Sequence, residues 1–392
     1  MGSENVVRIF DDSARSNFKV AVVHPWFITN GGGEKVVEAL ARLYPNADFF
    51  GLMVSPEHVP PALQGRTIRS TFLDYVPQSR HYYKHLSPLY PIATRWLDVT
   101  AYDLVISSGG PAAKNVKVSP HAVHVHYCHS PVRFLWDQFA TWQARLPAIA
   151  RPLYRASCAY LRKWDYLAAQ RVDAFIANSD YVGERIRRYY NRESTTIYPP
   201  VAVQPQYQPA TPGNYYLSVG RLVAHKRVDL IIQACNLLQR PLLIVGSGPE
   251  EAQLKAMAGP TIRFAGRVDD ETLKAHFLNA RAFLFAGDED FGIATVEAQS
   301  YGLPVIAFKS GGTLEIVDCA PQSANPTGVL FPTQENHAVT QAIHEFEAFE
   351  HRFDRQHIWR RSTRFNQETF DRRIVAFIDT LLDQRRAAVA AE

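Results

Sequence analysis

Two cations and one carboxylate in the second half of the chain suit a phosphorylated ligand that is rich in hydroxyl groups. Arg221 and Lys226 stand five residues apart, directly after an apolar run. This spacing does not place them on one helix face, but a turn can bring both charges to one point, and two cations beside a helix N-terminus favour a diphosphate. Glu297 shares a helix face with Ile293 and Tyr301, where a carboxylate is costly unless hydroxyl groups hydrogen-bond to it. The pattern favours a site for a diphosphate that carries a sugar, although a charged surface turn and a helix carboxylate with a local partner would give the same residues.

Three consecutive acids lie between these groups. Asp288, Glu289 and Asp290 follow an apolar run and lead into a helix that we expect to start near Gly292. Carboxylate oxygens in this D-x-D arrangement would suit Mn²⁺ or Mg²⁺. Their position late in the chain, directly before the helix that carries Glu297, favours a direct contact to the ligand instead. Activity that survives a chelator would separate the two interpretations.

Two further loops have explanations that need no ligand. Gly246 opens the run Gly-Ser-Gly-Pro after another apolar segment, and glycine there would let the backbone approach a ligand, although a tight turn without a ligand would look the same. Pro249 is well placed to open the next helix. Asp269 and Asp270 are interpreted as N-caps of a helix over residues 271–279.

These loops need strands to position them, and apolar β-rich runs recur along the chain with amphipathic stretches between them. Continuous apolar runs that alternate with helices indicate parallel strands covered on both faces. Two such series predict two doubly wound α/β domains, in which ligands bind beyond the carboxyl ends of the strands. We expect strands at 19–24, 47–51, 103–107, 122–127, 174–178 and 195–198, and then at 215–219, 242–245, 262–265, 282–285, 304–307 and 329–331.

The segment from Tyr198 to Gly213 separates the two series. It is rich in proline and glutamine and has no helical or strand periodicity, so it predicts a stiff connector. The boundary gives an N-terminal domain over residues 1–200 and a second domain over residues 201–364. An amphipathic segment over about 365–382 follows the second series.

Composition excludes several classes of protein. The chain has 392 residues with 46% apolar and 12% aromatic content, which indicates folded domains, and its formal net charge of +4 gives no support for nucleic-acid binding. The four cysteines are scattered without a C-x-x-C pair, which suits reduced thiols in a cytoplasm. We expect neither a signal peptide nor a transmembrane helix, so any contact with a membrane would be made from its surface.

Together the motifs resemble the family 4 glycosyltransferases. The resemblance rests on Arg221, Lys226, Glu289 and Glu297, and on short motifs that follow in family order across nearly the whole chain: Asn30-Gly31-Gly32-Gly33-Glu34, Asn178-Ser179, Tyr198-Pro199-Pro200 and Gly311-Gly312-Thr-Leu-Glu315. It implies the GT-B fold, in which two Rossmann-like domains face an interdomain cleft. The N-terminal domain would bind the acceptor and the second domain the nucleotide sugar. By the same analogy a C-terminal helix over about 365–392 would cross back and pack on the N-terminal domain.

The resemblance assigns roles to individual residues. Arg221 and Lys226 would neutralise the donor diphosphate, Glu297 would accept hydrogen bonds from the ribose, and Glu289 would orient the transferred sugar. Arg267 and Val268 would border the base of the donor, and the backbone of Asp290, Phe291, Gly292 and Ile293 would line its diphosphate. The loop of Gly31, Gly32 and Gly33 would close over the donor, and Gly246 would also contact it. Transfer would retain the anomeric configuration, and electrostatic stabilisation of the leaving diphosphate would require no metal and no other cofactor.

One departure from the family pattern bears on the donor. In many members a glycine follows the equivalent of Lys226, whereas this chain has Arg227, and the run from Gly220 to Asp229 resembles a branch that includes bacterial mannosyltransferases. That implies GDP-mannose as donor and a glycan or a polyprenyl-diphosphate-linked saccharide as acceptor in polysaccharide biosynthesis. A UDP-sugar donor and a protein that binds nucleotide sugars without transferring them stay open. A nucleotide-sugar epimerase or dehydrogenase is set aside, because no tyrosine has a lysine four residues later.

A histidine-rich run lies in the first half of the chain. His124 and His126 alternate onto one strand face, and His129 lies past the strand end. Metal binding is disfavoured because a strand splays the third residue away and no carboxylate is near, so His124 and His126 are expected to be structural. By the family resemblance, His129 would lie at the interdomain cleft and hydrogen-bond the transferred sugar, and Arg133 would help to hold an anionic acceptor such as a lipid diphosphate.

Two segments of the first half mix cations with aromatic residues. One runs from Arg80 to Trp96, and the other contains Arg151, Arg155, Arg162, Lys163 and Trp164. Such mixtures suit a surface that docks on anionic lipid. A solvated helix face that packs its aromatic residues inward is the simpler explanation on composition alone. We expect the protein at the inner face of the cytoplasmic membrane only if its acceptor is carried on a lipid.

Overall fold

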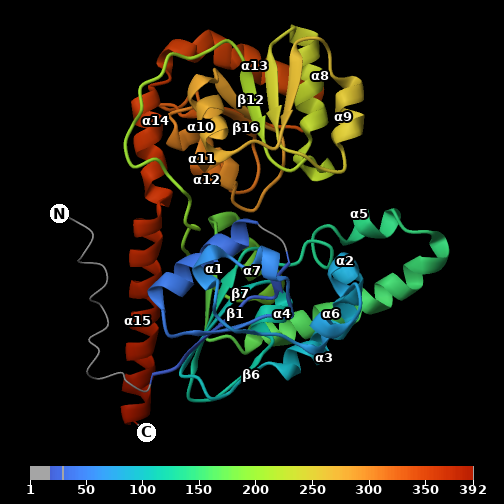
Figure 1. Ribbon diagram of the computed structural model, residues 1–392, viewed down its shortest axis with the longest axis vertical. Helices are drawn as coiled ribbons and strands as arrows, with labels where there is room; N and C mark the ends of the chain where they lie inside the picture. Colours follow the sequence, from blue (N-terminus) through green and yellow to red (C-terminus); the bar gives the residue numbers. More distant parts are fainter. Residues whose placement is uncertain (1–17, 29–30, 392) are drawn as a thin grey trace. The chain divides into compact units, whose positions relative to one another are not determined.

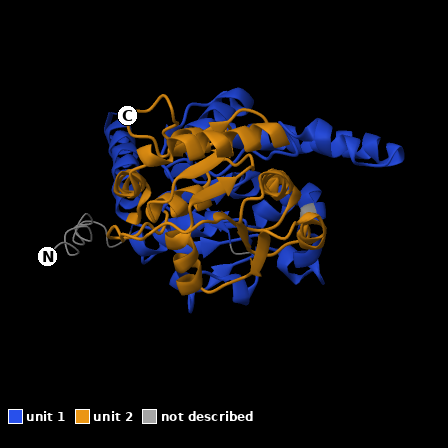
Figure 2. Cartoon of the chain, turned by 90° about the horizontal axis from the view of Figure 1, so that it is seen from above, with its two compact units in different colours: residues 1–200, 368–392 blue, residues 201–367 orange. Residues whose placement is uncertain are grey.

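The computed structural model describes residues 18–28 and 31–391, and the chain divides into two compact units (Figures 1 and 2). Unit 1 comprises residues 1–200 and 368–392, and unit 2 comprises residues 201–367. Asn30 of the glycine motif and the N-terminal residues 1–17 lie outside the described residues. Each unit is a parallel sheet covered by helices, so the predicted fold class is confirmed.

Unit 1 is built on a seven-stranded parallel sheet in the order β11-β10-β9-β7-β1-β3-β5. Its strands are β1 (Val20–Val23), β3 (Asp48–Phe50), β5 (Ile68–Arg69), β7 (Leu104–Gly109), β9 (Val123–Cys128), β10 (Ala174–Ala177) and β11 (Thr195–Thr196). Two short pairs stand beside it, β2 (Trp26–Phe27) with β4 (Met53–Val54), and β6 (Asp98–Val99) with β8 (Lys117–Val118). The chain order reverses between β1 and β7, and such a switch point is where open α/β sheets bind ligands.

The helices of unit 1 cover both faces of this sheet and include the C-terminal helix (Figure 1). They are α1 (Gly32–Leu43), α2 (Ser79–Tyr82), α3 (Tyr90–Ala93), α4 (Pro111–Lys114), α5 (Phe139–Ala144), α6 (Arg151–Gln170), α7 (Asp180–Tyr190) and α15 (Gln367–Ala391). In α15, Phe370, Ile374 and Ile378 are buried in the same core as Val22 and Ile106 of the sheet. The C-terminal segment therefore folds as part of unit 1, and its helix extends beyond the amphipathic stretch read from the sequence.

Unit 2 is built on a six-stranded parallel sheet in the order β14-β13-β12-β15-β16-β17. Its strands are β12 (Tyr216–Val219), β13 (Leu242–Val245), β14 (Ile262–Gly266), β15 (Ala282–Phe285), β16 (Val305–Phe308) and β17 (Gly328–Phe331). Its helices are α8 (Val228–Leu238), α9 (Glu251–Met257), α10 (Asp270–Asn279), α11 (Ile293–Ser300), α12 (Thr313–Ile316), α13 (Asn336–Phe349) and α14 (Arg355–Ser362). Here the switch point lies between β12 and β15.

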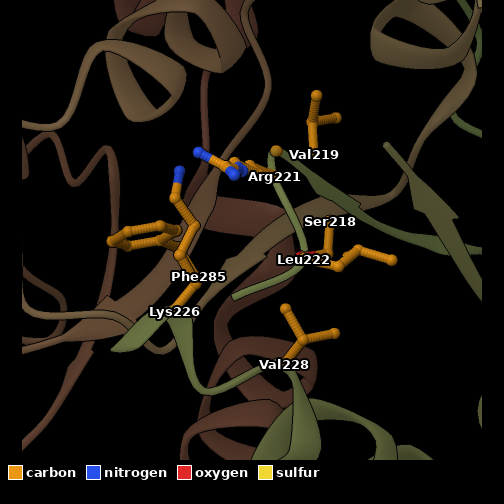
Figure 3. Close-up of a pocket in the computed structure, with 8 residues that line it drawn as sticks. Ser218, Val219, Arg221, Leu222, Lys226, Val228 and Phe285 are labelled. Carbon is orange, nitrogen blue, oxygen red and sulfur yellow. The ribbon is translucent and has the colours of Figure 1, made fainter. Parts of the chain in front are cut away.

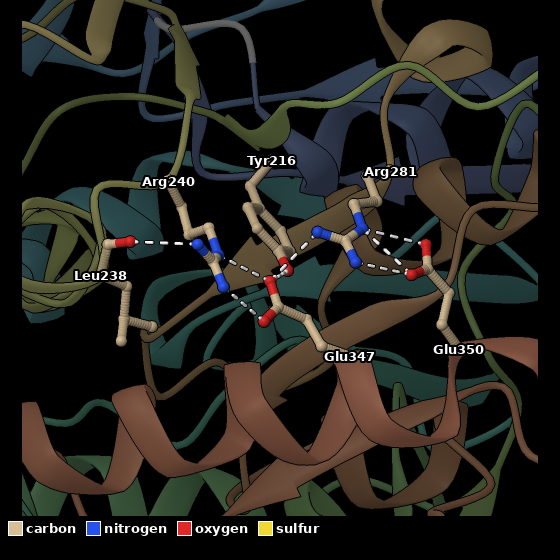
Figure 4. Close-up of polar contacts among 6 residues, drawn as sticks. All are labelled: Tyr216, Leu238, Arg240, Arg281, Glu347 and Glu350. Carbon is tan, nitrogen blue, oxygen red and sulfur yellow. Dashed lines mark hydrogen bonds and ion pairs between the residues drawn. The ribbon is translucent and has the colours of Figure 1, made fainter.

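A network of hydrogen bonds and ion pairs holds the amino ends of β12 and β15 in place (Figure 4). The Glu347 carboxylate on α13 accepts hydrogen bonds from the Tyr216 hydroxyl at 2.9 Å, from Arg240 Nε at 2.8 Å and from Arg281 Nη1 at 3.1 Å. Arg281 also pairs with Glu350 at 2.6 Å. Because Tyr216 begins β12 and Arg281 directly precedes β15, the network fixes the two strands that flank the switch point.

Every strand expected from the sequence is present, and the connector over residues 197–215 contains no helix or strand. Two expectations about helix starts are wrong. Helix α9 begins at Glu251, two residues after Pro249, and Asp270 is the first residue of α10 rather than its cap. Asp269 alone caps α10, because its carboxylate accepts the Thr272 N–H at 2.8 Å. Among the described residues, no helix is both long and apolar enough to span a bilayer.

Candidate functional site

The four loops of unit 2 that stand out in the sequence follow four neighbouring strands. They come after β14, β13, β12 and β15, which are consecutive in the sheet, so the loops lie side by side at its carboxyl edge. Gly246 has a φ of +128°, and a Cβ there would collide with the carbonyl oxygen of Gly220. Arg267 Nε donates a hydrogen bond to Ser247 Oγ at 2.9 Å. The turn after β13 thus requires glycine in order to pack on the turn after β12.

An ion pair crosses the switch point of unit 2. Lys226 ends a short 3₁₀ helix over Ala224–Lys226, and its Nζ lies 2.9 Å from Glu289 Oε1 in the loop after β15. The two side chains are 18% and 22% exposed, and the ammonium lies 5.7 Å from the centre of the Phe285 ring. Arg221 and Lys226 line one small pocket (Figure 3), together with Ser218, Val219, Gly220, Leu222, Val228 and Phe285. The turn therefore brings both cations to one place, as the sequence suggested.

The backbone conformation at Arg227 explains why glycine is common at this position in the family. Arg227 has a φ of +51°, a left-handed conformation that favours glycine and costs other residues roughly 1–2 kcal/mol. Its guanidinium pairs with the carboxylate of Asp229 at 3.0 Å. The glycine common at this position in the family therefore matches a conformation that the chain keeps with arginine.

The acidic loop after β15 is held by the loop after β16. Asp288 Oδ1 accepts a hydrogen bond from Ser310 Oγ at 2.8 Å, and the Glu289 carbonyl accepts the Gly312 N–H at 3.1 Å. Gly311 has a φ of +60°, and a Cβ there would collide with the Glu289 carbonyl oxygen. This packing fixes the position of the Glu289 backbone against Gly311 and Gly312, which gives a structural reason for the Gly311-Gly312 motif.

Helix α11 starts directly after the acidic loop. Gly292 caps it with a φ of +108°, and the first N–H groups of a helix have no partner within the helix. The Phe291 side chain is buried and meets the Phe365 ring edge-on at 5.4 Å, so only its backbone is placed for a ligand. Ile293 and Glu297 lie on one half-buried face of the helix, as the spacing predicted.

Unit 1 contributes a second cluster of polar groups at its own switch point. His24 follows β1, Ser108 lies in β7, and His129 follows β9. Ser108 is hydrogen-bonded through its carbonyl to His24 Nδ1 at 3.0 Å and through its hydroxyl to His129 Nε2 at 2.9 Å. A Cβ on Gly33 would lie 3.4 Å from His129 Nε2, so the glycine loop at the start of α1 packs against the histidines. Burial lowers the pKa of His129 to about 3 and that of His24 to about 4, which keeps both rings neutral at neutral pH.

The other histidines of the run and Arg133 have different surroundings. His124 and His126 face the same residue, with Nε2 and Nδ1 lying 2.8 and 2.9 Å from Ser107 Oγ respectively, as expected for structural groups on one strand face. Arg133 is half-buried in the segment after β9. Arg185 holds this segment through hydrogen bonds to Ser130 Oγ, the Pro131 carbonyl and Asp137 at 2.9–3.0 Å.

The predicted residues therefore form two groups. Arg221, Lys226, Gly246, Arg267, Val268, Glu289, Asp290, Phe291, Gly292, Ile293 and Glu297 lie on loops and helix starts of unit 2, and Gly31, Gly32, Gly33, His129 and Arg133 lie in unit 1. The roles assigned to them toward a donor and an acceptor stay predictions. Sequence reasoning missed His24 and Ser108, although His24 directly follows the first strand of a doubly wound sheet, where ligand-binding loops occur.

Two family models match the chain. The model for glycosyl transferases group 1 matches residues 203–364, and the model for Glycosyltransferase Family 4 matches residues 30–204. Among curated proteins, the D-rhamnosyltransferase WbpZ of Pseudomonas aeruginosa is 30% identical over 136 residues, which are 33% of this chain and 35% of that protein. A GDP-mannose-dependent alpha-mannosyltransferase of Corynebacterium glutamicum is 30% identical over 119 residues, or 30% and 29% of the two chains. The matches thus span about a third of the length of these relatives.

Solved structures agree in fold across nearly the whole chain. The sucrose-phosphate synthase of Thermosynechococcus elongatus superposes with a TM-score of 0.68 at 19% identity and covers 93% of this chain and 100% of that one. Anabaena HepE in complex with UDP superposes with a TM-score of 0.66 at 16% identity and the same coverage. At these identities the likeness shows a shared fold. With the family models matching unit 1 and unit 2 in turn, the chain belongs to the family 4 glycosyltransferases and has the GT-B fold.

Proposed function

We propose that the chain transfers mannose from GDP-mannose, with retention of the anomeric configuration, to a glycan or a polyprenyl-diphosphate-linked saccharide in bacterial polysaccharide biosynthesis. The observation that carries the proposal is the meeting of Arg221, Lys226 and Glu289 at the switch point of unit 2, where α/β sheets bind nucleotides. The similarity to the GDP-mannose-dependent alpha-mannosyltransferase of Corynebacterium glutamicum supports GDP-mannose as the donor. The four cysteines, which are free thiols in the structure, support a cytoplasmic site of action.

The proposed chemistry is electrostatic. When the bond between the sugar and the diphosphate breaks, negative charge grows on the leaving GDP, and the Lys226 ammonium and the Arg221 guanidinium stabilise it. The N–H groups at the start of α11 add partial positive charge at the same edge of the sheet. The departing phosphate oxygen takes the proton of the acceptor hydroxyl on the face it leaves, so no metal and no protein base are needed for the step.

The carboxylates have separate parts in this proposal. Glu289 holds the Lys226 ammonium and accepts hydrogen bonds from hydroxyls of the transferred sugar, which fixes the sugar without taking up a proton. Glu297 accepts hydrogen bonds from the ribose on the half-buried face of α11. His129 is a neutral hydrogen-bonding group for the sugar, since burial keeps its pKa far below neutral pH.

A donor screen with a transfer assay tests the proposal. Purified protein is first ranked by thermal shift against GDP-mannose, GDP, UDP-glucose and UDP, since a ligand that binds the folded state raises the melting temperature. Transfer from the stabilising donor to lipid-linked and free saccharides is then measured with and without EDTA, and the product anomer is assigned by NMR. We expect GDP-mannose to be used, EDTA to have no effect and the α-anomer to form.

The other outcomes point to the alternatives. Use of a UDP-sugar but not of GDP-mannose refutes the donor, and loss of activity in EDTA refutes the metal-independent chemistry. Binding of GDP-mannose without transfer or hydrolysis, with every acceptor tested, would instead favour a nucleotide-sugar-binding protein.

A further inference from the structure

Exposed large apolar side chains are concentrated in one part of unit 1. Among the described residues, eleven of the fourteen such side chains fall between Tyr75 and Leu167. Ile149 is 92% exposed, Leu153 76% and Trp96 65%. Soluble surfaces carry large apolar groups singly, whereas a concentration of this kind marks a surface that binds something.

Helix α6 presents an apolar stripe within this region. Leu153, Tyr160 and Leu167 are each seven residues apart and exposed, so they lie on one face of the helix, while Leu161 and Asp165 face the core. The start of α6 and the neighbouring α5 project from the body of unit 1 (Figures 1 and 2). No acidic residue occurs between Gln138 and Trp164, although this stretch contains five arginines or lysines.

A basic pocket of about 1040 Å³ adjoins the C-terminal half of the stripe, and Tyr160 and Leu167 are among its walls. Its cations are Arg95, Lys117, Lys163, Arg171 and Arg385. They come from both of the segments that mix cations with aromatic residues, from strand β8, from the turn before β10 and from α15. The sequence could not show that these distant segments meet.

The charges of this pocket are unbalanced. Asp173 is the carboxylate in its lining, and its Oδ2 already accepts the backbone N–H of His124 at 2.7 Å. Asp98 stands opposite Lys117 in the β6–β8 pair and adds a second negative charge nearby. Among the described residues, none of the five cations forms an ion pair. Arg171 and Arg385 donate hydrogen bonds to Asn115 Oδ1 and to the Pro120 carbonyl, and neither acceptor carries a charge. The pocket therefore offers a net positive charge to an anion.

We propose that this face of unit 1 docks on an anionic lipid surface, with lipid phosphates in the basic pocket and the apolar stripe of α6 in the interface between headgroups and acyl chains. Cations beside exposed tryptophan, tyrosine and aliphatic side chains are the combination that such surfaces bind. A second copy of the chain is a poorer occupant, because a two-fold contact would bring the five cations against themselves. The pocket is lined by residues that precede β9 and β10, at the opposite edge of the sheet from His129, so docking leaves the candidate site of unit 1 open.

Vesicle sedimentation of the full chain tests this proposal. We expect binding to phosphatidylglycerol vesicles, none to phosphatidylcholine vesicles, and weakening by salt. The double variant Arg95→Gln/Lys163→Gln should bind roughly 30-fold more weakly, at roughly fivefold for each cation near an anionic surface. The matched control is Arg42→Gln/Arg188→Gln, which removes the same charge from exposed positions of unit 1 outside the pocket and should retain most of the binding.

A second variant tests the apolar stripe without changing charge. Ile149→Asn/Leu153→Asn should also weaken binding to phosphatidylglycerol, and both exposed positions tolerate a polar residue, so the melting temperature should stay unchanged.

Equal binding to both lipids, equal losses in the pocket and control variants, or no binding at all would overturn the proposal. So would inorganic pyrophosphate binding in the pocket without vesicle binding, or a dimer that the Ile149→Asn/Leu153→Asn variant abolishes. Donor binding is proposed for unit 2 and is measured by thermal shift rather than by vesicle sedimentation. The proposed transfer activity and the proposed membrane docking can therefore fail independently.

Discussion

Replacing Lys226 with alanine should remove most of the transfer activity and leave unit 2 folded. The reason is that the Lys226 ammonium has a modest structural role but a central place in the proposed chemistry. Its ion pair with Glu289 joins two loops that other contacts already hold, such as the hydrogen bond from the Gly312 N–H to the Glu289 carbonyl. The variant therefore separates the site from the fold.

The expected loss of stability is small. The ion pair spans 2.9 Å, but its partners are 18% and 22% exposed, so water and salt screen part of the attraction, and pairs of this kind contribute about 1 kcal/mol or less. In a unit of the size of residues 201–367, 1 kcal/mol corresponds to roughly 2–4 °C in melting temperature. We therefore expect the melting temperature to fall by no more than about 4 °C.

The expected loss of activity is large. A fixed charge that faces the leaving group in the transition state is worth roughly 2–4 kcal/mol, because the site is already organised and loses no solvent on reaction. At about 1.36 kcal/mol for each factor of ten, kcat/KM should fall roughly 30- to 900-fold. Lys226→Arg keeps the charge but places it on a planar group of different reach, so it should recover only part of the rate.

The assay is release of GDP from GDP-mannose in the presence of acceptor, measured beside a thermal melt. The matched control is Lys255→Ala, which breaks an ion pair of similar length to Glu251 at 2.7 Å on α9, away from the switch point of the same sheet. It should keep full activity. If Lys226→Ala retains more than a third of wild-type kcat/KM at an unchanged melting temperature, Lys226 does not contact the leaving group and the site assignment is wrong.

Three further predictions follow from the same contacts. Glu297→Ala should weaken donor binding, whereas Glu289→Ala should reduce turnover more than affinity; equal, near-wild-type kinetics for both variants in a steady-state assay would contradict the assignments. Gly246→Ala should lower the melting temperature of unit 2 and weaken nucleotide binding, because its φ is positive and the new methyl group would collide with the turn after β12; unchanged GDP affinity would contradict this. Acidification should destabilise unit 1, because the pKa values of His24 and His129 are lowered in the folded chain to about 4 and about 3. The unfolded chain binds these protons first, so stability should be lost as pH falls from about 6.5 toward 4, and a denaturant titration that shows no such slope would refute the burial of neutral rings.

Most strands could be predicted from the sequence because they lie in apolar runs, and central strands such as Val20–Val23 and Ala282–Phe285 are buried on both faces. Leu242–Val245 and Ala282–Phe285 have the bounds expected of them, since a short apolar run between turn-forming residues is typical of a buried parallel strand. The edge strand β5 and the strand pairs β2–β4 and β6–β8 could not be predicted, because a strand of two residues has no periodicity of its own. Pro249 was misleading for a related reason: a proline suits the first turn of a helix but does not fix which residue starts it.

The contacts of the candidate site depended on a different kind of information. That Arg221, Lys226 and Glu289 follow strands can be read from the sequence, but which strands are neighbours cannot. The pairing of β12 with β15, rather than with β14, brings Lys226 to Glu289. In the same way, Ser108 joins His24 to His129 only because β7 lies between β1 and β9 in the sheet.

The two ends of the strand pair β12–β15 show why one end is structural and the other is suited to a ligand. At the amino end, Glu347 accepts hydrogen bonds from one hydroxyl and two guanidinium groups, so its carboxylate is nearly saturated within the fold. At the carboxyl end, Lys226 and Glu289 have, among the described residues, one ion-pair contact with each other. An ammonium has three donors and a carboxylate about four acceptor sites, so most of their hydrogen-bonding capacity remains for a bound group. A phosphate beside Lys226 would accept its remaining hydrogen bonds, and sugar hydroxyls beside Glu289 would donate to its remaining acceptor sites. An ion pair with only a structural role would not need these free hydrogen-bonding sites at a switch point.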